Sequence, residues 1–318
     1  MAYILAADIG GTSCKLAIFN EDIEVVHKWR IASSVGDYKD MLGSVTESFR
    51  TQLEKIGSSF KECIGLGVGV PGPVDFESGT VNGAVNLGWE THVPVGDILS
   101  KLTGLSVRVD NDANMAALGE QYKGAGKNDR HVAVLTLGTG VGGGIIINRE
   151  LIHGHAGAGG EVGHMKVDHT EQFLCNCGHR GCLETVASAT GIVNLTYALK
   201  ENFPNSSLSS VIDAGTLTSK DVIQAAADKD QLALHILNKA SFYIALGMSY
   251  IASTVNPSRF VIGGGVSAAG TILLDSIISQ FPSMTFPPAA ENVNIVLAEL
   301  GNDAGMYGAA RIIEQYVK

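Results

Sequence analysis

A run of potential metal ligands between Glu161 and Glu184 is the densest group of reactive side chains in this sequence. Three thiols and one imidazole match a tetrahedral Zn²⁺ site in which the protein fills every coordination position. Such a closed site leaves no place for water or substrate, so the sequence predicts a structural zinc. The predicted ligands are His164, Cys175, Cys177 and Cys182.

Two glycine- and threonine-containing turns suggest a second kind of chemistry, the binding of phosphate. Residues 3–20 and 131–148 align without a gap, and each segment has the pattern of an apolar strand, a turn and another apolar strand. Exposed backbone N–H groups in such turns can bind an anion closely. Asp8, just before the first turn, is placed to hold Mg²⁺ on a phosphate. The turn residues are Gly10, Gly11 and Thr12, and Gly138, Thr139 and Gly140.

Two other glycine patterns do not predict a nucleotide site of a familiar kind. Residues 67–72 and 138–143 both satisfy G-x-G-x-x-G. A dinucleotide-binding fingerprint must open a helix, whereas prolines follow the first pattern and an apolar strand follows the second. The sequence also lacks G-x-x-x-x-G-K-[ST], which excludes a P-loop.

Asp112 is the candidate general base. It lies where a predicted strand at Val107–Val109 meets a helix that begins around Asn111, a usual place for polar groups that face a cleft. Aspartate at a helix start is also a common N-cap. Asn111 or Asp110 could serve as the cap equally well, which would leave Asp112 free.

The remaining patterns predict alternating strands and helices that hold these groups. Ile4–Ala7 and Lys15–Phe19 form a predicted hairpin, and Ile64–Val70 forms a further strand. Apolar residues recur at helical spacing from Tyr38 to Phe49. The apolar run Ser241–Val255 has helical spacing but is too short and mixed to span a membrane. The repeat of the opening pattern suggests two copies of one domain plan.

Composition limits the possible functions. The 318 residues are 45% hydrophobic, 17% charged and rich in glycine, with 39 of them, as in a soluble α/β enzyme with many tight turns. A net charge of −10 argues against a nucleic-acid surface. We expect no secretory signal and a cytoplasmic location, because no basic segment and apolar core open the chain.

The cysteines and histidines outside the predicted metal site do not indicate a further functional site. The five cysteines give no paired disulfide framework. Cys14 and Cys63 lie in apolar runs, where we expect them to pack as small hydrophobic side chains. The histidines near the metal cluster, His153, His155 and His169, are interpreted as solvated loop residues.

The motifs together resemble the ROK family of sugar kinases, and among its members the bacterial glucokinases. The resemblance implies an actin-like ATPase fold, with two α/β domains flanking a cleft. Residues 1–117 would form a smaller domain joined by the C-terminal helix 303–318, and residues 118–302 a larger one with the zinc site. Homodimers are common in this family. The matching segments are 8–12, 67–75, 111–114, 137–143, 161–164, the C-x-C-G-x-x-G-C-x-E run, 263–265 and 303–305.

The resemblance also implies an activity, the ATP- and Mg²⁺-dependent phosphorylation of a hexose at its 6-hydroxyl, with glucose as the leading substrate. Asp112 would take the hydroxyl proton. The phosphates of ATP would meet Asp8 and both glycine turns, and Gly263, Gly264 and Gly265 would lie near adenosine, unless they form only a packing turn. The implied sugar contacts are Asn86, Asn111, Asp112, Glu161, His164 and Glu184.

Other functions stay open at this point. The implied contacts are shared by kinases for fructose, N-acetylmannosamine or another hexose. The phosphoryl donor is either ATP or polyphosphate. A non-catalytic sugar sensor or an actin-like assembly protein would not need Asp8, Asp112 and both phosphate turns together. A repressor would place a DNA-binding helix-turn-helix before Asp8, where we expect none.

Overall fold

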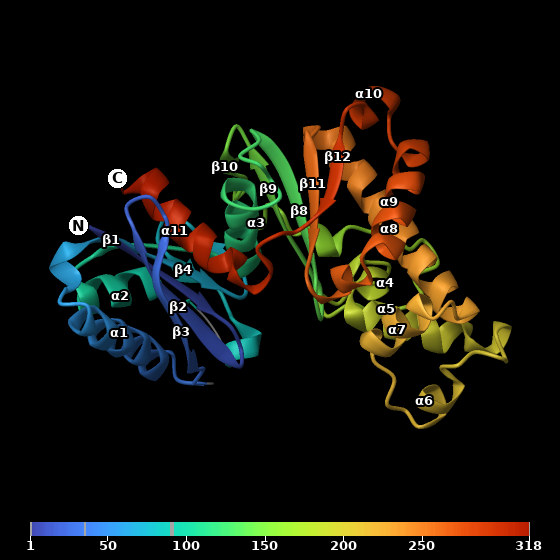
Figure 1. Ribbon diagram of the computed structural model, residues 1–318, viewed down its shortest axis with the longest axis horizontal. Helices are drawn as coiled ribbons and strands as arrows, with labels where there is room; N and C mark the ends of the chain where they lie inside the picture. The colour runs from blue at the N-terminus through green and yellow to red at the C-terminus, as the bar shows by residue number, and fades with distance from the viewer. Residues whose placement is uncertain (1, 35, 90–91, 318) are drawn as a thin grey trace.

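Two five-stranded sheets, one in each half of the molecule, organise the fold (Figure 1). The computed structural model describes residues 2–34, 36–89 and 92–317. In spatial order, the first sheet contains β3 (Val25–Ala32), β2 (Ser13–Asn20), β1 (Tyr3–Ile9), β4 (Cys63–Val70) and β7 (Ser106–Asn111). The second contains β10 (Glu150–Leu151), β9 (Val141–Ile147), β8 (His131–Leu137), β11 (Arg259–Gly263) and β12 (Asn294–Leu297).

The two sheets share one plan, which confirms the repeat seen in the sequence. In each sheet three strands pair antiparallel, and the innermost of these is followed by two further strands that run parallel to it. The glycine turns join β1 to β2 and β8 to β9, as predicted. The turns differ by one residue, because pairing ends at Ile9 and Cys14 in the first hairpin and at Leu137 and Val141 in the second.

Helices cover the outer face of the first sheet. The predicted helical spacing forms α1 (Tyr38–Lys55), and α2 (Val95–Thr103) packs beside it. The apolar face of α1 joins the core formed with β1, β2 and β4. Asp37 begins α1 as its N-cap, because its carboxylate accepts the N–H of Lys39. A small ribbon, β5 (Val74–Asp75) with β6 (Thr80–Val81), extends this half of the molecule.

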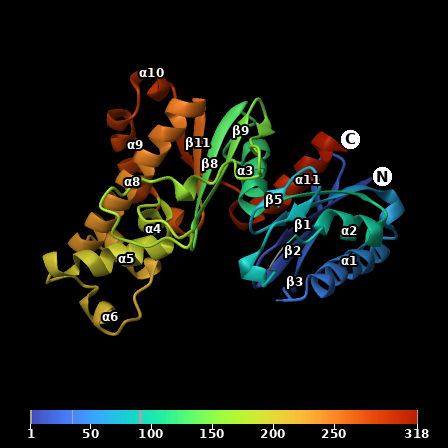
Figure 2. The same cartoon turned by 180° about the vertical axis from the view of Figure 1, so that it is seen from behind.

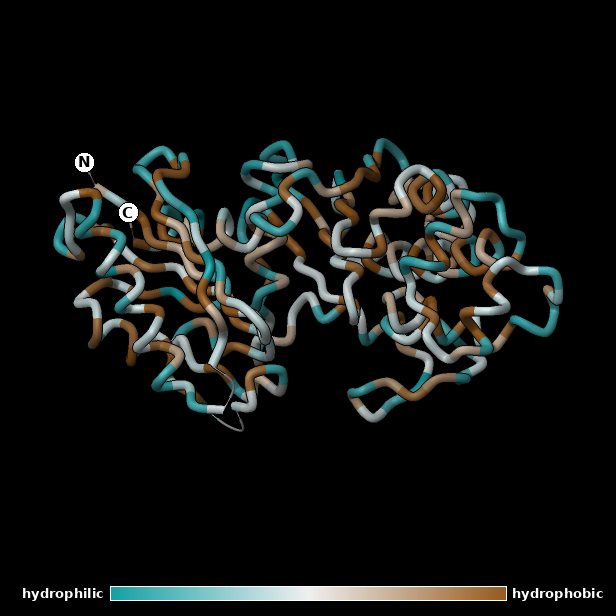
Figure 3. The backbone as a smooth tube through the Cα atoms, turned by 60° about the horizontal axis from the view of Figure 1, so that its bottom comes forward, coloured by the Kyte–Doolittle hydropathy of each residue, from teal (hydrophilic) through white to brown (hydrophobic). Residues whose placement is uncertain are grey.

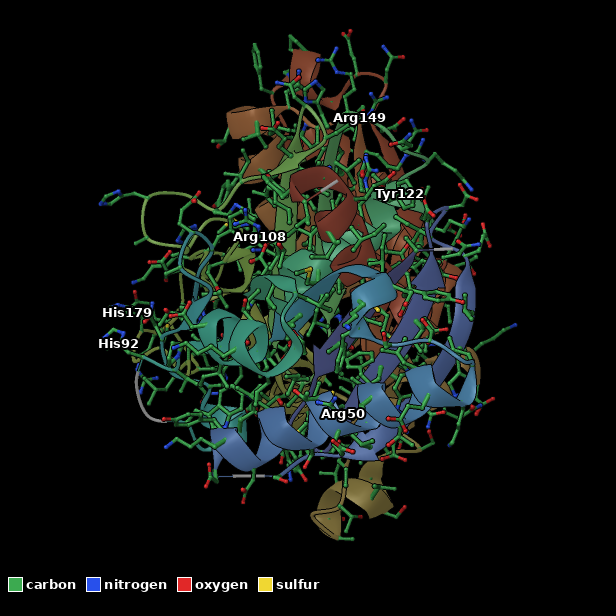
Figure 4. The ribbon with its side chains drawn as sticks, turned by 90° about the vertical axis from the view of Figure 1, so that its left-hand side faces the viewer. Arg50, His92, Arg108, Tyr122, Arg149 and His179 are labelled. Carbon is green, nitrogen blue, oxygen red and sulfur yellow. The ribbon has the colours of Figure 1, made fainter. Side chains whose placement is uncertain are left out.

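Two helices lie between the sheets, α3 (Asp112–Tyr122) and α11 (Ala304–Tyr316) (Figure 1). They approach so closely that a Cβ on Gly308 would lie 1.8 Å from the carbonyl oxygen of Met115. A Cβ on Gly119 would lie 2.0 Å from the carbonyl oxygen of Ala304. Glycine therefore allows the backbones to touch, and α3 is fixed in place by the last helix of the chain. Tyr122, labelled in Figure 4, ends α3 under the guanidinium of Arg311.

The second half adds a helical layer around its sheet, which Figure 2 shows from behind. Long α8 (Gln231–Val255) packs with α5 (Ala189–Leu199), α7 (Ser219–Ala227) and α9 (Thr271–Met284), while α4 (Glu184–Ala187), α6 (Ser209–Asp213) and α10 (Pro287–Ala290) are short. Figure 3 shows hydrophobic stretches along the strands and hydrophilic turns at their ends. In residues 2–34, 36–89 and 92–317, no helix has the length and apolar character needed to cross a bilayer.

We propose that these halves are the two domains expected from the sequence, 1–117 with 303–318 and 118–302. The contacts of α11 with β1 and β4 support the return of the C-terminal helix to the first half. The proposed boundary at residue 117 falls within α3, which contacts α11 and also β9 of the second sheet.

Candidate functional site

A cavity of about 970 Å³ lies where both sheets present the carboxyl ends of their strands. Its walls come from the ends of β1, β7 and β8, from the start of α3, and from the loops on either side of His164. Ligands of open α/β sheets bind at such strand ends. Predicted site residues in its lining are Asp8, Gly10, Asn86, Asn111, Asp112, Gly138, Gly140, Glu161, His164, Cys177, Glu184 and Gly264.

Seven other predicted site residues in the described part of the chain do not line this cavity. Five belong to the two turns or to the glycine segment after β11, and two are buried metal ligands. Each of the five lies within two positions of a lining residue in the chain, and the two cysteines belong to the metal cluster. These residues are Gly11, Thr12, Thr139, Gly263, Gly265, Cys175 and Cys182.

Asp112 begins α3 and faces the cavity. Its Oδ1 accepts the N–H of Ala113 at 2.9 Å. Burial, together with the negative charge of Asp8 and of Glu161, raises the pKa of Asp112 to about 6. A carboxyl group with that pKa is a stronger base than an ordinary aspartate and is still mostly ionised at neutral pH.

Asn111 is the N-cap of α3, which decides between the two capping residues that the sequence left open. Its side-chain oxygen accepts the N–H groups of Ala113 at 2.8 Å and Asn114 at 3.3 Å. Its Nδ2 donates to the carbonyl oxygen of Gly72 at 3.0 Å. Asp112 is thereby free of the capping role, while Asn111 also ties the helix start to the loop after β4.

Asp8 forms an ion pair with Lys15, a residue that the sequence reasoning missed. The two lie opposite each other in the first hairpin, and Lys15 Nζ is 2.7 Å from Asp8 Oδ2. Both line the cavity, and Lys15 is the only lysine or arginine in the lining formed by the described residues. The register of the predicted hairpin, which pairs position 8 with position 15, was the signal that could have found it.

The glycines near the cavity allow close approach of other groups. A Cβ on Gly140 would lie 2.2 Å from Glu184 Oε2, and that oxygen accepts the N–H of Val141 at 3.0 Å. Glu184 thus supports the second turn as well as facing the cavity. A Cβ on Gly11 would lie 3.1 Å from the carbonyl oxygen of Asn86, so the first turn rests on the loop of Asn86.

Gly264 is needed for packing, as the competing explanation for residues 263–265 supposed. Its φ is +85°, and a Cβ there would lie 2.5 Å from the backbone of Leu137. The same residue lines the cavity beside the second turn. A place near adenosine stays a prediction for this segment.

The four predicted metal ligands converge. Their ligand atoms all lie within 4.8 Å of one another. Cys175 Sγ is 3.6 Å from His164 Nδ1, and Cys177 Sγ is 3.7 Å from Cys182 Sγ. Ligands at the usual Zn–S distance of about 2.3 Å stand roughly 3.8 Å apart in a tetrahedron, so this donor set fits zinc.

His164 presents its two ring nitrogens to different partners. Nδ1 faces the cysteines, whereas Nε2 lies 3.8 Å from Glu161 Oε2. Both side chains are partly open to the cavity, with 39% and 42% of their surface exposed. A metal on Nδ1 would fix the proton on Nε2, which would then point toward Glu161 and any bound ligand.

The interpretation of His153 as a solvated loop residue is wrong. Its side chain is only 17% exposed, and Nε2 lies 2.7 Å from Asp110 Oδ2. Phe76, whose ring stacks on the imidazole, is distant in sequence, so no local sequence pattern indicated that His153 is buried. His155 and His169 are exposed, as predicted.

The two cysteines outside the cluster differ in burial. Cys14 is fully buried in β2, as predicted. Cys63, at the start of β4, is partly buried and packs against the same core. In the described residues all five cysteines are free thiols.

Comparisons with known proteins identify the family. The model of the ROK family matches residues 4–316. The glucokinase of Halalkalibacterium halodurans is 39% identical over 315 residues, which cover 98% of this chain and 95% of that protein. The glucokinase of Thermotoga maritima is 35% identical over 319 residues, with 99% and 98% coverage.

A solved structure agrees with these relatives. The ROK family glucokinase of Streptomyces griseus, in complex with glucose and AMPPNP, is 30% identical, has a TM-score of 0.78 and covers 99% of this chain and 100% of its own. The expected actin-like ATPase fold is therefore confirmed. By sequence and by fold, this chain belongs to the ROK family.

Proposed function

We propose that this protein is an ATP-dependent hexose kinase that phosphorylates glucose at its 6-hydroxyl. The observation that carries the proposal is the position of Asp112, a partly buried carboxylate with a raised pKa, in one cavity with the Asp8–Lys15 pair and both glycine turns. Phosphoryl transfer needs a base, an anion-binding surface and an oriented hydroxyl, and the same cavity offers all three. The glucokinase names of the full-length relatives support glucose as the substrate.

Asp112 would act as the general base. As the sugar hydroxyl oxygen bonds to the γ-phosphorus, its proton passes to the Asp112 carboxylate, and the bond from that phosphorus to the bridging oxygen of ADP breaks. The pKa of about 6 suits this transfer, because the carboxylate is ionised at neutral pH yet accepts a proton more readily than an exposed aspartate.

The phosphate half of the site would combine backbone amides, one metal ion and one lysine. The turns at 10–12 and 138–140 offer N–H groups to the phosphates of ATP. The hard carboxylate oxygens of Asp8 fit Mg²⁺, which when bound neutralises charge on the phosphate oxygens. Lys15 adds a positive charge to a cavity that otherwise presents the carboxylates of Asp8, Asp112, Glu161 and Glu184.

The sugar half would be shaped by the zinc cluster. We propose that Glu161, His164 and Glu184 accept or donate hydrogen bonds to sugar hydroxyls, with Asn86 and Asn111 beside them. Zn²⁺ bound by His164, Cys175, Cys177 and Cys182 would hold this wall rigid, since closed zinc sites stabilise the fold around them. We further propose a cytoplasmic location, because zinc binding requires the free thiols that a reducing compartment maintains. A homodimer is proposed only from the family resemblance.

An ADP-release assay over a sugar panel tests the proposal. Glucose, fructose and N-acetylmannosamine are each supplied with ATP, and glucose is also supplied with polyphosphate as donor. We expect the highest kcat/KM with glucose and ATP. Preferred turnover of another hexose would support a different sugar kinase of the family. Binding of sugars without any turnover would contradict the kinase and favour a sensor.

A further inference from the structure

A buried hydrogen bond between His153 and Asp110 connects the two halves of the molecule next to the residues that line the cavity. Asp110 is the fifth residue of β7 in the first sheet and only 1% of its side chain is exposed. His153 follows β10 of the second sheet and donates from Nε2 to Asp110 Oδ2 at 2.7 Å, since a carboxylate oxygen only accepts. The pair thus connects segments that are far apart in the sequence and belong to different sheets.

The partners of Asp110 place it directly under the start of α3. Its Oδ1 accepts the backbone N–H of Asn111 at 2.7 Å and the side-chain amide of Asn114 at 3.0 Å. Only Oδ2 is left for His153. The carboxylate therefore links His153 to Asn111, just before Asp112, and to Asn114, two positions after it.

An aromatic group holds the imidazole of His153 from its other side. The ring stacks on Phe76, with centroids 4.2 Å apart and planes 14° from parallel. Phe76 in turn meets the edge of Tyr316 at 5.2 Å. The guanidinium of Arg108, labelled in Figure 4, lies over both rings at 5.6 and 5.7 Å. His153 is fixed by stacking as well as by its hydrogen bond.

The loop that leads from His153 to Glu161 is pinned at intermediate points. The N–H of Gly159 donates to the carbonyl oxygen of His153 at 2.7 Å. Gly157 has a φ of +72°, and a Cβ there would lie 2.3 Å from the carbonyl oxygen of Val74. The loop therefore rests on β5 of the first half, and its position determines where Glu161 enters the cavity.

We propose that His153 is a positioning residue for sugar binding. Its bond to Asp110 sets the separation between Glu161, which would hold sugar hydroxyls, and Asp112, which would face the reacting hydroxyl. This inference rests on the proposed function. If this bond only stabilised the fold, its loss would lower the melting temperature but would not weaken sugar binding more than nucleotide binding.

Three variants test the role of His153. Removal of the imidazole in His153→Ala should weaken glucose binding, measured by calorimetry, about tenfold and leave AMPPNP binding within twofold of the wild type. His153→Gln retains an N–H donor and should recover most of the affinity. His155→Ala, on the same loop but exposed, should match the wild type.

The outcomes separate this inference from the proposed function. If the wild type neither binds nor phosphorylates glucose, the proposed function is wrong. If the wild type does both and His153→Ala binds glucose equally well, the positioning role alone is refuted. Equal losses of glucose and AMPPNP affinity, or a glutamine variant as weak as the alanine variant, would also refute it. A tenfold loss confined to glucose and restored by glutamine supports it.

Discussion

Replacing Asp112 with asparagine should remove catalysis and at the same time stabilise the protein at neutral pH. The phosphorylation rate should fall by about 10²–10⁴-fold, the usual contribution of a general base. The stability gain follows from the pKa of Asp112, which burial and the charges of Asp8 and Glu161 raise from 3.8 to about 6. Each unit is worth about 1.4 kcal/mol, so roughly two units correspond to about 3 kcal/mol.

The sign of this effect depends on pH. The pKa of the carboxyl is higher in the folded than in the unfolded protein, so the folded state binds more protons between about pH 4 and pH 6. Stability therefore falls as pH rises through that window and stays lowered above it. Asparagine carries no charge and its oxygen can still accept the N–H of Ala113. The variant should gain nothing at pH 4 and the full difference at pH 7.5.

Thermal unfolding of both proteins at pH 4 and pH 7.5 measures this difference, and calorimetry checks that glucose still binds. We expect a melting temperature several degrees higher for the variant at pH 7.5 only. Asp213→Asn, at an exposed position, is the matched control and should show no such pH dependence. A variant that is less stable than the wild type at pH 7.5, or that turns over normally, would refute the reasoning.

Three further changes test other parts of the site. Cys177→Ala should reduce bound zinc, melting temperature and glucose affinity together, and metal analysis with calorimetry would contradict this if affinity were unchanged in metal-free protein. Lys15→Met should lower kcat and AMPPNP affinity at least about tenfold, while glucose affinity is unchanged. Its control is Lys28→Met, at an exposed position. Equal kinetics in the two variants would exclude a role for Lys15. Gly308→Ala should destabilise by about 1–3 kcal/mol because its Cβ would overlap Met115. Gly43→Ala, with open space in α1, should stabilise slightly; urea unfolding separates the two.

Sequence patterns were sufficient where the signal was local. The hairpins around residues 10–12 and 138–140 follow from apolar strands flanking glycine turns, and the structure has both. The metal cluster was also local, because three of its ligands lie in one short loop and His164 precedes it by eleven residues. The position of Asp112 between β7 and α3 followed from the change in periodicity.

Contacts between distant segments were not predictable from the sequence. His153 is buried because Phe76 and Asp110, from the first half of the chain, pack against it. The spacing of residues within its own loop does not indicate these contacts. The close crossing of α3 and α11 depends on Gly119 and Gly308, which look like ordinary helical glycines in the sequence. Such contacts require the tertiary arrangement of both halves.

A structure with glucose and AMPPNP bound tests the central claim most directly, because the claim concerns which group faces the reacting hydroxyl. We expect the 6-hydroxyl oxygen within about 3 Å of an Asp112 carboxylate oxygen, with the γ-phosphate beside Asp8 and Lys15. Glu161 and His164 should contact other hydroxyls of the same sugar. A sugar whose 6-hydroxyl points away from Asp112, or that binds outside this cavity, would contradict the account.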